Sequence, residues 1–217
     1  VDVSSAVAGP WVSSWLAEFG ADVIFIEKVG TPDVMRMTGA ISGDQSGCWV
    51  HMHRNKRGMD LDVRTEAGRD ILIQLVSEAD VFIQNFRPGV AERLKIDYPT
   101  LSQVNPSLVY LSVSGFGAEG PYVNRPVYDP IIQAISGMTE AQNGTYVKAV
   151  VADKTTAMAG ANAVLANKRG KFATKITAIS SMCPGKANAN PRLKAVTAKT
   201  SKSRVSITSR SPARPGK

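Results

Sequence analysis

Short apolar runs alternate with segments of helical periodicity through residues 1–166, and this alternation constrains the fold most strongly. Three runs have the length and apolar content of strands buried in a parallel sheet: residues 21–27, 81–83 and 108–113. Residues 9–20 and 65–76 place apolar side chains three and four positions apart, which is typical of one face of a helix. The order strand, helix, strand predicts a Rossmann-like α/β fold, a parallel sheet with helices on both faces.

Turn and cap residues predict further elements. Residues 1–3 are interpreted as the end of a first strand, and Thr65 is placed to cap the helix that follows it. The pair Asp129-Pro130 has the pattern of a helix start. After it, residues 147–151 are a strand candidate, and the Ala-rich residues 153–165 are helical in composition.

The composition changes abruptly at residue 167. The chain of 217 residues holds 26 Lys and Arg against 18 Asp and Glu, but residues 167–217 carry thirteen of those basic side chains and no acidic one. Residues 1–166 are therefore mildly acidic, as in many metabolic enzymes. We predict two parts, a globular domain over 1–166 and a basic low-complexity tail over 167–217. The tail has too little apolar content to offset its chain entropy, so we expect it to be disordered.

The sequence also argues against several classes of protein. It has no run of 18 apolar residues, so we expect no membrane-spanning helix. Its first ten residues do not have the pattern of a signal peptide. Two cysteines are too few for a disulfide scaffold, which favours a reducing, cytoplasmic compartment.

Asp153 stands directly after the strand candidate, at the start of a helix. The commonest use of an aspartate there is to cap the helix. The alternative is a carboxylate nucleophile, and the two roles are compatible because the positive end of a helix helps to keep a carboxylate ionised.

Three other features invite a functional interpretation. His51 and His53 alternate on what we take to be a strand and so face one side, but Cys48 is the one further ligand nearby, and we predict no metal site. The basic segment 54–57 is interpreted as a solvated turn rather than a nucleic-acid patch. Ser114 lacks the glycine two positions before it that a nucleophile elbow requires.

A series of short motifs follows in order along the chain. They are Ala8-Gly9-Pro10, Gly20-Ala21-Asp22-Val23-Ile24, Ile26-Glu27-Lys28, Arg54-Asn55-Lys56-Arg57, Asp60-Leu61-Asp62, Ala79-Asp80-Val81, Asn85-Phe86-Arg87-Pro88-Gly89, Asn105-Pro106, Ser114-Gly115-Phe116-Gly117, Gly120-Pro121-Tyr122, Tyr128-Asp129-Pro130 and Ala152-Asp153. Together, residues 1–166 resemble the family III CoA-transferases, which include formyl-CoA and carnitine CoA-transferases and 2-methylacyl-CoA racemases.

This resemblance implies an enzyme of acyl-CoA metabolism. In the family, an aspartate takes up an acyl group and then CoA, through an anhydride and an aspartyl-CoA thioester, as in covalent catalysis generally. Asp153 stands at the position of that aspartate. The resemblance further implies an acyl-CoA donor, a carboxylate acceptor, no metal and an interlocked homodimer. It implies no membrane partner, and nucleic acid would bind through the tail alone.

The resemblance also assigns contacts to coenzyme A. They fall on Val7, Ala8, Lys28, Leu61, Asp62, Val63, Arg64, Asn85, Phe86, Arg87, Arg93, Arg125, Pro126, Val127, Tyr128 and Asp129. The cations suit phosphates and Phe86 suits the adenine or the pantetheine arm. From the residues alone, a lone cation is more often a solvated surface charge, and Phe86 equally suits the core. Val7 stands where some of these transferases carry Gln, which would remove a polar contact near the thioester.

Two alternatives remain for the function. The racemase branch has a catalytic His before the aspartate of its Gly-His-Asp motif, whereas this chain has Tyr128, whose pKa near ~10 suits a base poorly. The other alternative is a non-catalytic CoA-binding fragment with a nucleic-acid-binding tail. Members of the family are longer, so we interpret residues 167–217 as the product of a shifted reading frame and expect the chain to have little activity.

Overall fold

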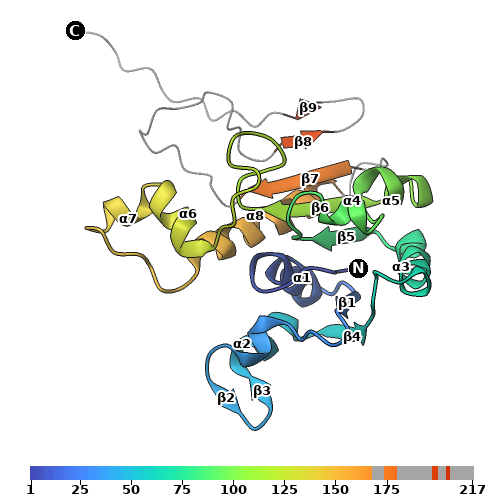
Figure 1. Cartoon of the computed structure of the whole chain (residues 1–217), viewed down its shortest axis with the longest axis horizontal. Helices are drawn as coiled ribbons and strands as arrows, with labels where there is room; N and C mark the ends of the chain where they lie inside the picture. Colours follow the sequence, from blue (N-terminus) through green and yellow to red (C-terminus); the bar gives the residue numbers. More distant parts are fainter. Residues whose placement is uncertain (168–173, 180–196, 200–203, 206–217) are drawn as a thin grey trace.

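The computed structural model describes residues 1–167 and, as backbone strands, residues 174–179, 197–199 and 204–205. Figure 1 shows a central sheet with helices packed against both of its faces. The predicted parallel α/β architecture is confirmed. The other residues of the predicted basic tail lie outside the described residues.

The strands of the sheet run in the order β4, β1, residues 1–3, β5, β6, β7. Their bounds are β1 Val23–Glu27, β4 Lys56–Asp60, β5 Val81–Gln84, β6 Val109–Ser114 and β7 Thr174–Ile179. Residues 1–3 join the two halves, because the Asp2 N–H donates to the Ile24 carbonyl at 2.9 Å and the Val3 N–H donates to the Ile83 carbonyl at 3.0 Å. All these pairings are parallel, whereas β8 (Thr197–Lys199) and β9 (Arg204–Val205) add antiparallel pairs beyond β7.

The order in which the chain adds strands to the sheet reverses next to residues 1–3. It first moves outward to β1 and β4, and then returns to place β5 on the opposite side of residues 1–3. The loops that follow residues 1–3 and β5 therefore lead away from each other at the carboxyl edge of the sheet. Such a switch point is where open α/β sheets commonly bind their ligands.

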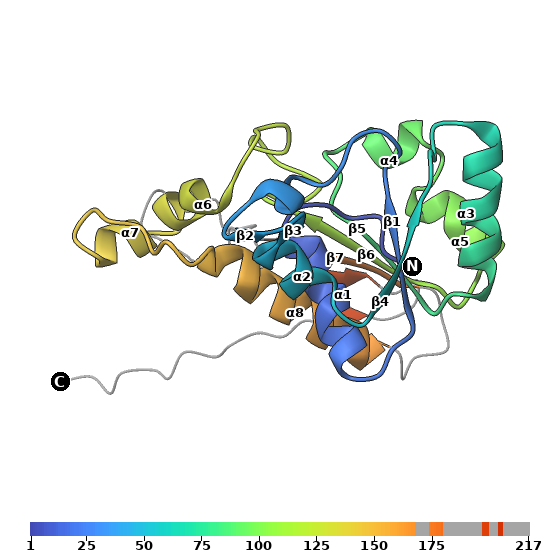
Figure 2. The same cartoon turned by 90° about the horizontal axis from the view of Figure 1, so that it is seen from below.

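Two helices cover each face of the sheet. Helices α1 (Ala8–Glu18) and α8 (Val151–Asn167) pack together on one face, and α3 (Glu66–Glu78) and α5 (Tyr98–Val104) pack together on the other (Figures 1 and 2). Each face has its own buried apolar cluster. The first contains Val12, Leu111 and Val164, and the second contains Leu72 and Leu101.

Shorter elements lie in the connections. They are η1 (Val34–Met37), β2 (Ile41–Ser42), β3 (Gln45–Ser46), α2 (Gly47–His53), α4 (Val90–Arg93), α6 (Asp129–Ile135) and α7 (Met138–Ala141). The predicted cap of α3 is confirmed, since the Thr65 hydroxyl accepts the Gly68 N–H at 3.0 Å.

Three local predictions are wrong, and several strands, among them β4 and β7, were not predicted. The segment 54–57 is not a solvated turn throughout, because Lys56 and Arg57 begin β4 and the Lys56 side chain is buried beside Asp2. Residues 147–150 form no strand, because the Gln133 side chain binds both the N–H and the carbonyl of Val147 in place of a neighbouring strand. His51 and His53 lie on the helix α2 rather than on a strand, since Ser46 caps this segment as a helix. After Ala166, where the apolar pattern ends, β7 pairs with β6 through backbone hydrogen bonds that do not depend on that pattern.

Candidate functional site

A cavity of about 610 Å³ opens at the carboxyl edge of the sheet, beside the switch point. Its walls are the segments that follow residues 1–3, β1, β4 and β5, together with part of α4. Predicted coenzyme contacts that line it are Lys28, Leu61, Asp62, Val63, Arg64, Phe86 and Arg93. The fold thus brings together residues that come from four separate segments of the sequence.

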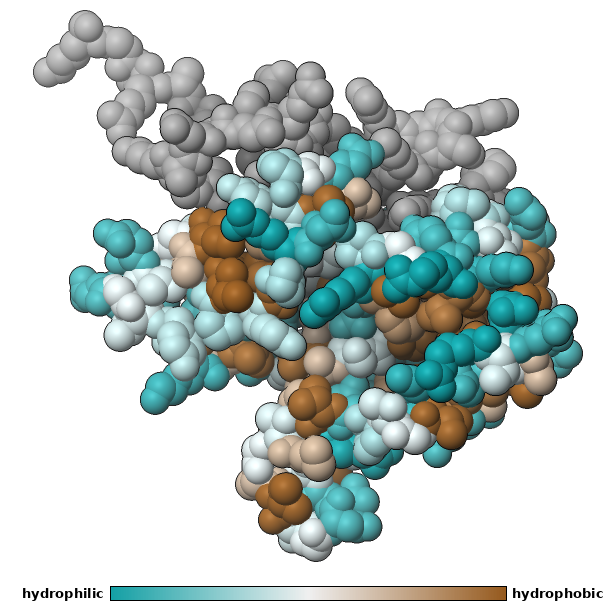
Figure 3. Space-filling model, in the orientation of Figure 1, coloured by the Kyte–Doolittle hydropathy of each residue, from teal (hydrophilic) through white to brown (hydrophobic). Residues whose placement is uncertain are grey.

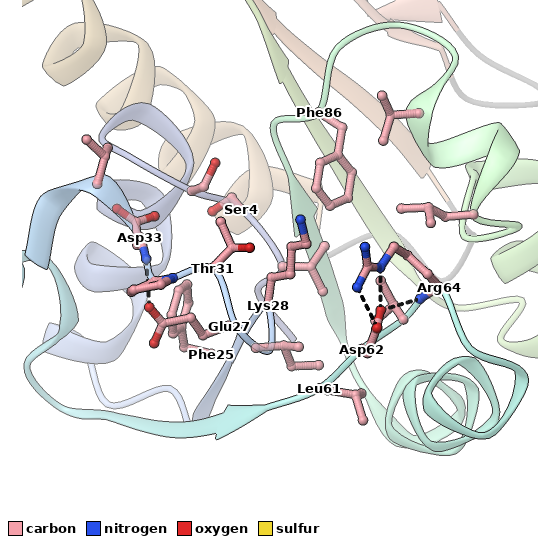
Figure 4. Close-up of a pocket in the computed structure, with 18 of the residues that line it drawn as sticks. Ser4, Phe25, Glu27, Lys28, Thr31, Asp33, Leu61, Asp62, Arg64 and Phe86 are labelled. Carbon is pink, nitrogen blue, oxygen red and sulfur yellow. Dashed lines mark hydrogen bonds and ion pairs between the residues drawn. The ribbon is translucent and has the colours of Figure 1, made fainter.

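Cations and one aromatic ring give this cavity its chemical character. In Figure 4, Lys28 points from the end of β1 toward Phe86, and Arg64 faces the same space. Arg64 binds both carboxylate oxygens of Asp62 at 2.7 Å, and these hydrogen bonds lower the pKa of Asp62 to about 2. Among the described residues, Lys28 and Arg93 form no ion pair, so their charges remain available to an anionic ligand.

Phe86 belongs to the core and also faces the cavity. Its ring is half-buried against the apolar cluster on the α3 and α5 face, and it also lines the cavity. A flat apolar wall beside cations suits a nucleotide that carries phosphates.

The segment from Ser4 to Ala8 connects this cavity to the start of α1. Asn85 holds it at Ser5, because the Asn85 amide accepts the Ser5 N–H at 2.9 Å and donates to the Ser5 carbonyl at 2.7 Å. Asp33 accepts the N–H of Ala6 at 2.8 Å, and Ala6 has a left-handed φ of 59°. Val7 and Ala8 are buried.

Gly9 is required for this close packing. A Cβ at position 9 would lie 2.3 Å from the Ser4 Cβ and 3.3 Å from the Asn85 Cγ. The glycine therefore allows helix α1 to begin directly against the segment that lines the cavity.

A buried polar network lies beneath the same segment. The Asp2 carboxylate is fully buried and accepts hydrogen bonds from the Ser4 N–H and from the hydroxyls of Ser4 and Ser13. Lys56 lies 3.6 Å from Asp2 and donates to the Pro10 carbonyl at 2.8 Å. Burial lowers the pKa of Lys56, and Asp2 opposes that shift. The network fixes the N-terminus of α1.

Asp153 lies in the first turn of α8, and it does not cap that helix. Its N–H donates to the Asp129 carboxylate at 3.0 Å, so Asp129 provides the cap. The Asp153 carboxylate makes no hydrogen bond or ion pair with the described residues. Burial and, secondarily, the charge of Asp129 raise the pKa of Asp153 to about 6.

Helices α1 and α8 both begin at the carboxyl edge of the sheet. Each helix leads back to the start of a parallel strand, so each runs antiparallel to the strands. Ala8 and Ala157 belong to the same buried cluster, and Asp153 lies one turn before Ala157. The carboxylate and the cavity therefore occupy the same edge, joined by the segment from Ser4 to Ala8.

The remaining predicted contacts lie outside the cavity. Val127 packs with Phe116 and Ala152, next to the start of α8. Asp129 is buried, and both of its carboxylate oxygens accept hydrogen bonds from this chain. Arg125 lies over the Tyr122 ring at 4.8 Å. Exposed members of the set are Arg87, Arg125, Pro126 and Tyr128.

The described residues contain no group of three potential metal ligands. His53 is enclosed instead by aromatic rings, with Trp49 stacked at 3.8 Å and Phe25 at 4.2 Å. Burial and, secondarily, Lys56 lower the pKa of His53 to about 3, and neither ring nitrogen has a hydrogen-bond partner among the residues described.

Sequence analysis missed Gln133, which is fully buried between Asp129 and Val147. Its spacing of four from Asp129 on a helix is the signal that would have paired the two side chains. Asp2, Ser13 and Lys56 were missed as a network because they lie far apart in the sequence and carry no shared motif.

The chain matches the profile of CoA-transferase family III over residues 1–174. It is 40% identical over 141 residues to the acetyl-CoA:oxalate CoA-transferase of Acetobacter aceti, which covers 65% of this chain and 36% of that enzyme. It is 30% identical over 180 residues to the human succinyl-CoA:glutarate CoA-transferase, covering 80% of this chain and 41% of the human enzyme.

A solved structure has the same fold. A CaiB/BaiF family protein from Brucella suis superimposes with a TM-score of 0.74 at 32% identity, over 80% of this chain and 49% of that protein. This chain therefore spans less than half of the length of each relative named here. None of its described helices has the length and hydrophobicity needed to cross a membrane. The motif order, the parallel sheet and the profile match agree, and the chain belongs to CoA-transferase family III.

Proposed function

We propose that this protein transfers CoA between carboxylic acids, with Asp153 as the nucleophile. The observation that carries the proposal is the Asp153 carboxylate, which has a raised pKa and no partner among the described residues. It lies at the sheet edge that also holds the cation-lined cavity. A pKa of about 6 leaves the group ionised at pH 7 and more basic than an ordinary aspartate, which favours nucleophilic attack.

The reaction proceeds through two anhydrides and one thioester. An Asp153 oxygen attacks the thioester carbon of the donor, the C–S bond breaks, and CoA leaves as a thiolate from an acyl–aspartyl anhydride. The thiolate then attacks the aspartyl carbon, which forms an aspartyl-CoA thioester and releases the donor carboxylate. The acceptor carboxylate displaces the thiolate to form a second anhydride. The thiolate attacks the acceptor acyl carbon, which releases the new acyl-CoA and restores Asp153.

The cavity is proposed to hold the nucleotide end of coenzyme A. Lys28 and Arg93 would contact its phosphates, and Phe86 would pack against the adenine or the pantetheine arm. Because each charge-assisted contact contributes roughly 1.5–3 kcal/mol, Lys28→Ala is expected to weaken CoA binding by about tenfold or more. Isothermal titration calorimetry measures this, and Lys148→Ala, an exposed lysine outside the cavity, is the matched control. Equal affinities for the two variants would contradict the assignment.

Trapping the covalent intermediate tests the nucleophile directly. The chain is incubated with an acyl-CoA and quenched with hydroxylamine, which converts an aspartyl thioester or anhydride into an aspartyl hydroxamate. Peptide mass spectrometry should find the hydroxamate at Asp153. Asp153→Asn should abolish the signal, whereas Asp44→Asn, which removes an exposed carboxylate in the β2–β3 turn, should leave it unchanged. A hydroxamate on another residue would refute the proposal.

Complete turnover depends on more than these residues. We propose that a functional molecule is a cytoplasmic homodimer and that the present chain, which spans less than half of its named relatives, turns over poorly. A coupled transfer assay and light scattering after size-exclusion chromatography measure activity and oligomeric state. Rapid turnover by a monomer would contradict both statements.

A further inference from the structure

Both the Nε2 and the Oε1 of the Gln133 side-chain amide form hydrogen bonds within the protein. Its side chain is completely buried on α6. The Nε2 group donates to the Asp129 carboxylate and to the Val147 carbonyl, the latter at 2.8 Å, while Oε1 accepts the Val147 N–H at 2.7 Å. A buried amide with these partners holds two segments in one arrangement, because any other orientation would leave buried polar groups unpaired.

Asp129 links Gln133 to Asp153, the proposed nucleophile, through hydrogen bonds to both residues. One carboxylate oxygen of Asp129 accepts from Gln133, and the other accepts the Asp153 N–H at 3.0 Å. A continuous chain of hydrogen bonds therefore runs from Val147 through Gln133 and Asp129 to Asp153. Asp129 is only 3% exposed, so its charge acts on Asp153 with little screening by solvent.

The backbone between Val147 and α8 is strained. Val150 has a left-handed φ of 43°, which is a genuine outlier for a β-branched residue. Such a conformation persists only where its surroundings over-determine it. Here Gln133 binds the preceding turn at Val147, and Val150 packs against the cluster that contains Val7 and Trp49.

We infer that Gln133 is a positioning residue for the transfer reaction, which acts through Asp129 to set the location and the ionisation of the Asp153 carboxylate. The inference rests on the proposed function of Asp153. A purely structural Gln133 would stabilise the contact of α6 with residues 147–150 and leave the ionisation of Asp153 unchanged.

The charged surroundings of Asp153 make this distinction measurable. Asp129, from α6, is the charged group that shifts its ionisation. Lys154, the adjacent residue on α8, lies over the Trp11 ring of α1 at 4.9 Å. Losing the hydrogen bond from Gln133 leaves one oxygen of the buried Asp129 carboxylate without its partner, so the carboxylate is no longer held beside Asp153 and repels it less.

The test is a carboxyl ¹³C NMR titration of the whole chain, with Asp153→Asn used to assign the Asp153 signal. Gln133→Met should move the Asp153 midpoint to lower pH, as Asp129→Asn should. In the Asp129→Asn background, Gln133→Met should move it no further. Gln133→Glu, which adds a negative charge beside Asp129, should move the midpoint to higher pH.

Each result decides the inference. An Asp153 midpoint unchanged by both Gln133→Met and Gln133→Glu, or a Gln133→Met shift that persists without the Asp129 charge, would overturn it. If Gln133→Met does not fold by circular dichroism, Gln133→Glu carries the test alone. The titration does not require the protein to turn over substrate. If hydroxamate trapping fails but the titration shifts are observed, the proposed function is contradicted and the coupling of Gln133 to Asp153 is not.

Discussion

At the residue scale, two aspartates of the candidate site differ in their surroundings, and the capping role that the sequence offered for Asp153 belongs to Asp129. Asp129 caps α8, and the Asp153 carboxylate in the first turn has no partner within the part of the chain that the structure describes. The positive end of the helix favours the ionised form of Asp153, but burial and the neighbouring charge outweigh it, and the net shift of the pKa is upward. The buried, ionised carboxylate of Asp153 therefore lowers the stability of the fold.

We expect this cost to be visible in the pH dependence. The folded-state pKa of about 6 lies above the unfolded value near 4, so the folded chain binds the proton more tightly. The contribution of Asp153 to the free energy of unfolding thus falls as pH rises from about 4 to 6, and the deficit persists above pH 6. Asp153→Asn should raise the free energy of unfolding at pH 7.5 by roughly 1–2 kcal/mol, measured by urea denaturation. A destabilised variant would contradict the burial argument.

The same pKa predicts the acid limb of the chemistry. Hydroxamate formation at Asp153 should decline as pH falls through about 6, because the protonated carboxyl is a poor nucleophile. Initial trapping rates from pH 5 to 8 measure the midpoint. A rate that stays constant down to pH 5 would mean that Asp153 ionises as an ordinary aspartate does.

His53 should affect stability with the opposite slope. Its folded-state pKa of about 3 lies below the unfolded value near 6.5, so the unfolded chain binds the proton more tightly. Stability is complete above about pH 6.5 and falls as pH decreases below it, by up to about 1.4 kcal/mol per pH unit from this residue. His53→Phe should flatten that decline in denaturation series, whereas His51→Phe, at an exposed position, should not. Equal slopes for all three proteins would contradict the assignment.

At the element scale, the start of α3 shapes the cavity wall. Gly68 lies beneath the segment from Asp62 to Arg64, and a Cβ there would be 2.1 Å from the Asp62 carbonyl oxygen. In most helices, Gly→Ala stabilises by up to about 1 kcal/mol. Here the backbone of a cavity-lining segment would have to move instead.

Gly68→Ala should therefore lower the free energy of unfolding by about 1–3 kcal/mol and weaken CoA binding. Denaturation and calorimetry measure the two effects. The matched control is Gly58→Ala in β4, where a Cβ meets nothing within 4 Å. If Gly68→Ala is neutral or stabilising, the close contact with Asp62 is not maintained in solution.

At the scale of the whole molecule, the chain presents apolar surface and only part of a family-length protein. On the face shown in Figure 3, apolar side chains gather over α6, where Ile131 and Ile135 are 44% and 50% exposed. Exposed apolar side chains of this kind are usual at surfaces that another part of a protein covers. The partial coverage of the relatives agrees with that interpretation.

The origin of the basic segment is a prediction about the gene. The family match runs past Ala166 to residue 174, into the segment 167–217 that carries thirteen basic and no acidic side chains. We expect a second reading frame of the DNA downstream of codon 166 to encode a family-like continuation. Nucleotide sequencing decides this, and the absence of such a continuation in every frame would support a genuine basic extension.

Much of the fold and part of the site followed from local patterns. The sequence predicted the strands β1, β5 and β6 and the helices α1, α3 and α8. Elements buried on one side leave a periodic pattern of apolar residues, and completely buried strands leave a continuous apolar run. The segment 147–150 was mispredicted because the backbone of Val147 pairs with the Gln133 side chain rather than with a strand. The helix α2 was mispredicted because seven residues give too short a window to separate the two periods.

The class of fold and the resemblance to the family could be predicted from residue types at fixed spacings, and the resemblance in turn made Asp153 the candidate nucleophile. That Asp129 caps α8, that Gln133 binds Val147, and which predicted contacts share a cavity became known from the folded arrangement of the chain. These features depend on distances between segments far apart in the chain. Burial and the charge of a neighbour set the pKa of Asp153, and neither exists until the chain has folded.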